Sequence, residues 1–248
     1  LGATTSLFPS DARTLAYLTR QQRAQDFSAQ TPDHDATYDE HMRLDLDTLE
    51  PLIARPDSPD NVCPISEVCG IPVNQVAIGS CTNSSYSDLM TVAAMLKGKT
   101  VHPNVSLVVT PGSRQVLHMI ARNGALADLI AAGARILESA CGPCAGMGQV
   151  PSFNAVSVRS FNRNFPGRSG GLDNRVYLAS PTACAAAALA GEIADPRAFA
   201  TEYIGLPDTY LVDDSGIFPP AAAPETIEIR RGPNIKPLPT RTDLEEAL

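Results

Sequence analysis

The sequence contains no tryptophan, and aromatic residues make up only 5% of its 248 residues. Apolar residues still account for 44% of the chain, so the core must be built from aliphatic side chains. No stretch approaches the roughly 20 consecutive apolar residues that a membrane helix needs. We therefore expect one large or two modest domains with an aliphatic core and no membrane partner.

Positive charge is also scarce. The chain has 19 Lys and Arg against 27 Asp and Glu, which gives a net charge of -8. This balance argues against nucleic acid or an anionic membrane surface as the main partner. A small anionic substrate is still compatible with it, because a local group of arginines can outweigh the net charge.

Six cysteines are too few to form a disulfide scaffold in a chain of this length. The first six residues, from Leu1 to Ser6, show neither the basic nor the apolar region of an export signal. We therefore predict a cytoplasmic protein with reduced thiols, some of which could bind a metal.

Short apolar segments alternate with helical patterns through the middle of the chain, which predicts a three-layer α/β/α domain with a mainly parallel sheet over residues 62–204. The expected strands are residues 73–80, 105–110, 135–139, 156–160 and 176–179, and the expected helices are residues 88–97, 114–123, 126–132 and 182–193. Ligands of such sheets gather at the carboxyl ends of the strands.

The flanking regions differ from this pattern. We expect a helix within residues 1–28, capped by Ser10 or Asp11. Residues 29–62 are acidic and contain several prolines, which predicts an extended connection, and residues 205–248 read as a Pro-rich linker.

Three cysteines fall in loops at predicted strand ends. Cys141 and Cys144 have C-x-x-C spacing, which alone fits a zinc site, a redox pair or two unrelated cysteines equally well. Cys81 occupies an equivalent loop and favours three convergent thiolates. The four histidines show no paired spacing that would supply the fourth ligand of a structural zinc site. Three thiolates without a fourth ligand suit a cubane cluster whose open iron can act as a Lewis acid.

A third loop carries Asn162, Arg163 and Arg168. Arginine matches carboxylates with two parallel hydrogen bonds, so this loop suits a substrate with several carboxylates. The alternative is an ordinary solvated basic loop. The three remaining cysteines are interpreted as structural, buried residues: Cys63, Cys69 and Cys184.

Four segments together resemble the signature segments of the aconitase family. They are Gly2-Ala3-Thr4-Thr5-Ser6, Gly79-Ser80-Cys81-Thr82-Asn83-Ser84-Ser85-Tyr86, Ala140-Cys141-Gly142-Pro143-Cys144 and Asn162-Arg163-Asn164-Phe165-Pro166-Gly167-Arg168. The resemblance covers about residues 1–200. It implies a [4Fe-4S] cluster held by Cys81, Cys141 and Cys144, with Asn162, Arg163 and Arg168 lining the cluster and binding substrate.

The resemblance also implies a domain plan. Residues 1–61 would form the end of the family's second domain with its connection, residues 62–204 the cluster-binding third domain, and residues 205–248 the linker to a swivelling fourth domain. The family's acid and base residues lie in parts that do not map onto this chain. We therefore assign no catalytic residue and expect the isolated chain to be inactive.

The activity implied is that of an aconitate hydratase, which interconverts citrate and isocitrate through cis-aconitate. Its partners would be a small tricarboxylic acid and the missing domains of the same enzyme. The residues Ser84-Ser85-Tyr86 and Cys141-Gly142-Pro143-Cys144 favour this over the alternatives, which are a homoaconitase and a 3-isopropylmalate dehydratase large subunit. Outside enzymes, the alternatives are an iron–sulfur sensor module and a zinc or thiol-redox domain.

Overall fold

The computed structural model describes residues 5–79, 81–199, 201, 204–228 and 230–236. Three parts of the sequence-based predictions lie outside these residues: Gly2–Thr4 of the opening segment, Ser80 of the first cysteine loop, and the linker from Pro237 onward. The chain divides into two compact units, Leu1–Val212 and Asp213–Leu248. The strands described below all belong to the first unit.

A seven-stranded sheet forms the centre of the first unit, in the order β2-β1-β7-β6-β3-β4-β5. Its strands are β1 (Leu52–Ala54), β2 (Val62–Pro64), β3 (Gln75–Ile78), β4 (Ser106–Val109), β5 (Arg135–Ile136), β6 (Val156–Arg159) and β7 (Arg175–Leu178). The five strands β3 to β7 run parallel, while β1 pairs antiparallel with β7 and with β2. The predicted α/β fold with a mainly parallel sheet is therefore confirmed.

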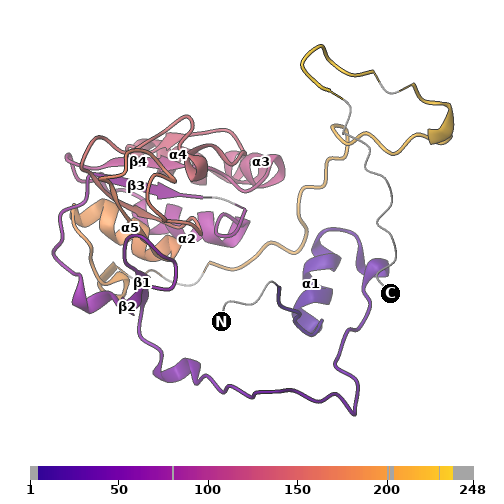
Figure 1. Cartoon of the computed structure of the whole chain (residues 1–248), viewed down its shortest axis with the longest axis horizontal. Helices are drawn as coiled ribbons and strands as arrows, with labels where there is room; N and C mark the ends of the chain where they lie inside the picture. Colours follow the sequence, from indigo (N-terminus) through magenta and orange to yellow (C-terminus); the bar gives the residue numbers. More distant parts are fainter. Residues whose placement is uncertain (1–4, 80, 200, 202–203, 229, 237–248) are drawn as a thin grey trace, which may run out of the picture. The chain divides into compact units, whose positions relative to one another are not determined.

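Helices cover one face of this sheet, where α5 lies against β3 and α2 lies against α5 (Figure 1). The helices of this layer are α2 (Tyr86–Leu96), α3 (Arg114–Asn123), α4 (Ala125–Ala131) and α5 (Pro181–Ala190). The side chains of Val76 and Ile78 are fully buried beneath them. Six consecutive small residues of α5 are also buried, so helix and sheet can approach closely.

The opposite face of the sheet carries a third layer made of chain segments that follow β5 and β6. Ala77 and Val108 pack there against Cys144 and Phe161 in a separate apolar cluster. Because side chains alternate along a strand, each strand contributes to both layers. The cysteine loop is thus part of the core of the domain.

The predicted helices and strands agree with the structure to within a few residues, but the β1–β2 hairpin was not predicted. It lies in the segment that we interpreted as an extended connection. Each of its strands is only three residues long, and a turn with Pro56 and Pro59 joins them. The hairpin is held by pairing with β7, which a local sequence pattern does not reveal.

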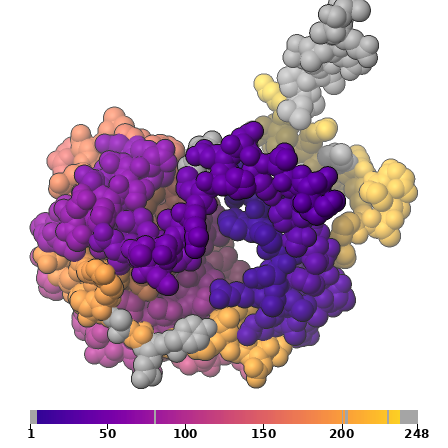
Figure 2. All heavy atoms as spheres, turned by 90° about the horizontal axis from the view of Figure 1, so that it is seen from below, coloured from indigo at the N-terminus to yellow at the C-terminus, as the bar shows by residue number. Residues whose placement is uncertain are grey.

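The N-terminal segment contains the predicted helix, α1 (Ala12–Arg20), whose N-cap is Asp11 as expected. Residues 21–51 form only short 3-10 turns, and the residues of this part of the chain, indigo to violet in Figure 2, lie at the surface. Among the described residues of the second unit, one short 3-10 helix is formed, Pro224–Thr226. None of the helices in the described ranges is long and apolar enough to cross a membrane.

Candidate metal centre

The three loops singled out in the sequence leave the same edge of the sheet. Cys81 follows β3, Cys141 and Cys144 follow β5, and the arginine loop follows β6. These strands are parallel, so their carboxyl ends share one edge. The order of the strands also changes direction at β3: the next strands, β4 and β5, lie on one side of it, and the later strands, β6 and β7, lie on the other. Such a switch point is where sheets of this class bind ligands.

Hydrogen bonds tie the loop after β3 to the loop after β6. The side-chain amide of Asn83 donates to the backbone oxygen of Ser160 at 2.6 Å. The hydroxyl of Ser160 accepts a hydrogen bond from the amide of Gly79 at 2.9 Å. Ser160 is fully buried, so these bonds are protected from water and hold the two loops in register.

The C-x-x-C segment forms a single 3-10 turn, Gly142–Ala145. The amide of Cys144 donates to the backbone oxygen of Cys141 at 2.9 Å. Cys141 is exposed at the outer end of the turn, and Cys144 is buried. Gly146 ends the turn at φ 72°, where a Cβ atom would lie 3.3 Å from the backbone of Ser169. A glycine therefore allows the cysteine turn to lie close to the arginine loop.

Arg168 joins these two loops directly. Its Nε donates to the backbone oxygen of Cys144 at 2.9 Å, and its Nη2 lies 3.7 Å from the Cys144 sulfur. The guanidinium also lies over the ring of Phe165, 5.7 Å from the centroid. Asn162 and Arg163, by contrast, are exposed. The structure thus places one predicted substrate residue against a predicted ligand and leaves two facing solvent.

The donor chemistry of the edge fits an iron–sulfur cluster. All six cysteines are free, and Cys81 and Cys141 are exposed. In the described part of the chain, no three His, Cys, Asp or Glu side chains are gathered closely enough to hold one metal ion. Each cysteine of a cubane binds a different iron, so Cys81 on one loop and Cys141 and Cys144 on another could each supply one thiolate to a cluster.

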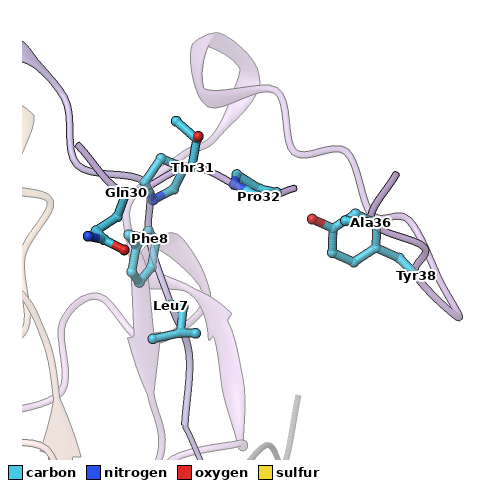
Figure 3. A pocket seen from close by; sticks show the side chains of 8 residues that line it. Leu7, Phe8, Gln30, Thr31, Pro32, Ala36 and Tyr38 are labelled. Atoms are coloured by element: carbon cyan, nitrogen blue, oxygen red, sulfur yellow. The ribbon is translucent and has the colours of Figure 1, made fainter. Parts of the chain in front are cut away.

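A cavity of about 480 Å³ borders the cysteine turn. It is lined by Arg135, Ile136, Leu137, Glu138, Ala140, Gly142, Pro143, Met147 and Gly148. A second cavity, of about 410 Å³, is formed within the N-terminal segment, where Leu7 and Phe8 lie beside Gln30 and Thr31 (Figure 3). None of the candidate ligands or substrate residues lines either cavity, but the first includes Gly142 and Pro143, the two residues between the cysteines of the C-x-x-C turn.

The cysteines outside the motifs differ from one another. Cys63 and Cys184 are buried, as expected for structural residues. Burial raises the pKa of the Cys184 thiol. Cys69 is exposed, so the expectation that it is a buried core residue was wrong. It follows a short 3-10 helix, Ile65–Glu67, and the apolar neighbour Val68 occupies the core position instead.

The sequence analysis did not predict the structural roles of two buried polar residues in or near the motifs, Asn164 and Arg159. Asn164 is buried and donates to the backbone oxygens of Arg55 at 2.7 Å and Val176 at 3.2 Å. Arg159 is fully buried at the end of β6. The only sequence signal for Arg159 is a charged residue in a strand that is otherwise buried on both faces.

Comparison with known proteins agrees with these motifs. A model of the aconitase family (aconitate hydratase) matches residues 1–70 and 66–191. The chain is 46% identical over 201 residues to 3-isopropylmalate dehydratase large subunit 1 of Methanopyrus kandleri, and 41% over 199 residues to large subunit 2 of Archaeoglobus fulgidus. It is 39% identical over 203 residues to large subunit 1 of Thermotoga maritima.

Each of these alignments covers 80% of this chain and 48% of the relative. The chain therefore spans about half the length of the curated relatives it matches. The family match extends over both the N-terminal segment and the sheet domain with its three loops. On this evidence, the chain belongs to the aconitase family.

Proposed function

We propose that this chain carries the [4Fe-4S] cluster of a hydro-lyase, bound by Cys81, Cys141 and Cys144. The observation that carries the proposal is the arrangement of the three motif loops at one edge of the sheet, with Arg168 bonded to the backbone of Cys144. Residues 1–61 would be the end of one domain with its connection, residues 62–204 the cluster-binding domain and residues 205–248 a linker. The connection would supply β1 to the sheet of the cluster-binding domain.

The favoured substrate class is a hydroxy acid like 3-isopropylmalate. The relatives named above are 3-isopropylmalate dehydratase large subunits, and they support this alternative better than citrate and isocitrate. The preference for aconitate hydratase had rested on the residues beside two motifs, Ser84-Ser85-Tyr86 and Gly142-Pro143. Those short segments carry less information than an identity of 46% over 201 residues. The partner expected for a large subunit is a small subunit or an equivalent domain.

Dehydration of such an acid removes a proton from carbon and breaks the bond to the hydroxyl on the neighbouring carbon, so that a double bond forms and water leaves. When bound, the cluster supplies a Lewis-acidic iron for the substrate hydroxyl. Arg163 is exposed and free to bind a substrate carboxylate with paired hydrogen bonds. Arg168 presents a second positive charge beside Cys144 while anchoring the turn.

The step also needs a base, and the histidines near the site are unsuited to this role. His102 accepts a hydrogen bond from the amide of Asn104, and its ring lies against Gly191. His118 is exposed on α3, an element that belongs to none of the motif loops. We propose that the base is supplied by another part of the enzyme.

The cluster assignment is tested by iron and sulfide analysis and visible absorbance of the anaerobically reconstituted chain. Cys81→Ser, Cys141→Ser and Cys144→Ser should each abolish the absorbance. Cys184→Ser is the matched control, because this cysteine is buried in α5 outside the motif loops, and it should retain the absorbance. Retention of a full cluster by any of the three ligand variants would overturn the assignment.

A further inference from the structure

Arg159 is a fully buried guanidinium with uncharged hydrogen-bond partners. Its Nε donates to the hydroxyl of Ser157 at 2.8 Å, and its Nη2 donates to the side-chain oxygen of Gln75 at 2.8 Å. Its Nη1 donates to the backbone oxygen of Pro143 at 2.7 Å. None of these three acceptors carries a negative charge. Burying a cation without an anion is costly, so such a residue needs a reason beyond stability.

The third of these bonds reaches the predicted metal centre. Pro143 lies between the two cysteines of the C-x-x-C turn, and Arg159 contacts it from β6, on the sheet beneath the turn. Ser157 in turn donates to Gln75 at 2.8 Å, so β3, β6 and the cysteine turn are joined in one buried network. The turn thus accepts one hydrogen bond from Arg159 of β6 and another from Arg168 of the arginine loop.

The guanidinium of Arg159 lies beneath the turn that carries Cys144, because its Nη1 donates to the backbone oxygen of the preceding residue, Pro143. Burial lowers the pKa of Arg159 to about 10, and attraction to a Cys144 thiolate acts in the opposite direction. The side chain therefore carries a positive charge at neutral pH. Opposite charges interact strongly where water is excluded, so a thiolate or a reduced cluster at Cys144 would be stabilised by this cation.

We propose that Arg159 is a positioning residue for the cluster: it fixes the Cys141–Cys144 turn through Pro143, and its buried charge raises the reduction potential of the cluster. This inference rests on the proposed function. A protein sets the reduction potential of an iron–sulfur cluster through the hydrogen bonds and charges around it. Reduction adds negative charge, which a fixed cation beneath the ligand favours.

Two variants separate the two roles. Gln75→Glu keeps the acceptor oxygen for Arg159 and places a carboxylate beside it, so the net charge of the network falls while its hydrogen bonds remain. Arg159→Lys keeps the charge but cannot make three hydrogen bonds in the geometry of a guanidinium. We would measure the midpoint potential of the reconstituted chain by redox titration, and amide hydrogen exchange of residues 142–147 in the cluster-free chain.

Gln75→Glu should lower the midpoint potential by at least about 59 mV, which for one electron is a tenfold shift towards the oxidised form. Amide exchange at the turn should be unchanged in this variant. Arg159→Lys should raise exchange at the turn about tenfold or more, with a smaller change in potential. A wild-type potential in Gln75→Glu would overturn the charge role, and unchanged exchange in Arg159→Lys would overturn the positioning role. If the wild-type chain binds no cluster, the proposed function and the charge role both fail, and exchange alone decides the positioning role.

Discussion

At the residue scale, Asn164 fastens the loop after β6 to the edge of the sheet. Its amide nitrogen donates to the backbone oxygens of Arg55 and Val176, beside the β1–β2 hairpin and in β7. Asn164→Ala would leave these buried acceptors without their donor, so the free energy of unfolding should fall by about 1–3 kcal/mol. Chemical denaturation measures this loss.

The neighbouring Asn162 is the matched control for this prediction, because it belongs to the same turn but is exposed. Asn162→Ala should change the free energy of unfolding by no more than about 0.5 kcal/mol. Equal losses in the two variants would show that the buried hydrogen bonds of Asn164 do not hold the loop.

Arg163 and Arg168 are two arginines of one loop with different surroundings. Arg163 is exposed, whereas Arg168 is half-buried and bonded to Cys144. In the complete enzyme, each change to Lys should weaken turnover by about 2–5 kcal/mol in kcat/KM. Arg163→Lys would lose a paired contact to substrate carboxylate, and Arg168→Lys would lose the hydrogen bond that anchors the turn at Cys144. Arg168→Lys should also lower the melting temperature of this chain, and Arg163→Lys should not. Wild-type kinetics in both variants would show that the loop is only a solvated basic surface.

At the scale of elements, α5 ends at a glycine that no other residue can replace without strain. Gly191 has φ 81°, and a Cβ atom there would lie 2.6 Å from the ring of His102. Gly191→Ala should therefore combine the cost of the left-handed conformation with that of overpacking, about 2–4 kcal/mol in total. Urea denaturation of the variant tests this estimate.

Gly98, which follows α2, provides the control. It also has a positive φ, 68°, but nothing lies within 4 Å of a Cβ built there. Gly98→Ala should cost only the backbone term, about 1–2 kcal/mol. If the free energy of unfolding falls equally in the two variants, the ring of His102 can move aside without destabilising the fold, and the packing argument is wrong.

Cys184 makes α5 sensitive to high pH. Burial raises the pKa of its thiol above the ordinary value of 9.0, so the folded chain keeps this proton where the unfolded chain releases it. The unfolded state then binds fewer protons, and stability should fall as the pH rises above about 9. The slope contributed by one such group is up to about 1.4 kcal/mol per pH unit.

Unfolding free energies of wild type and Cys184→Ala, compared between about pH 8 and about pH 10.5, test this sign. The variant should lose less stability per pH unit than the wild type, whatever its stability at neutral pH. Parallel curves would mean that the Cys184 thiol ionises equally in both states.

The sequence was most informative where local patterns decide the structure. The apolar periodicity and the terminal glycines located the helices from α2 to α4, because burial of one face and the end of each helix are local properties. The helix α5 was also expected, but the prediction ran past Gly191 to residue 193, whereas the helix ends at Ala190. It was uninformative about the β1–β2 hairpin, Asn164 and Arg159. Their roles depend on contacts with β7 and with the cysteine turn, which form only when distant segments meet.

At the scale of the whole molecule, the parallel sheet is what brings the candidate site together. Cys81, Cys144 and Arg168 are far apart in the sequence, yet the carboxyl ends of β3, β5 and β6 place their loops at one edge. The chain as a whole carries a net charge of -8, so the arginines of this edge are a local exception. The edge thus combines thiols with cations, as the proposed cluster and an acidic substrate would require.

This edge carries the proposed cluster ligands and carboxylate anchors, and none of its described residues is assigned as a base. The chain spans about half the length of its relatives. We therefore expect the chain alone, even with a full cluster, to leave 3-isopropylmalate, citrate and isocitrate unchanged in an anaerobic assay. Dehydration needs a base for the carbon-bound proton in addition to a Lewis acid, and loss of general acid–base catalysis alone typically costs about 10²–10⁴ in rate.

The same assay with the remaining parts of a 3-isopropylmalate dehydratase supplied in trans should restore turnover, and 3-isopropylmalate should be preferred to citrate. A preference for citrate would return the assignment to aconitate hydratase while leaving the cluster ligands in place. Turnover by the isolated chain at the rate of an intact enzyme would show that one of its own side chains acts as the base. His118 on α3 would then be the first residue to replace, because it is exposed and its ring is not packed against a helix end as that of His102 is.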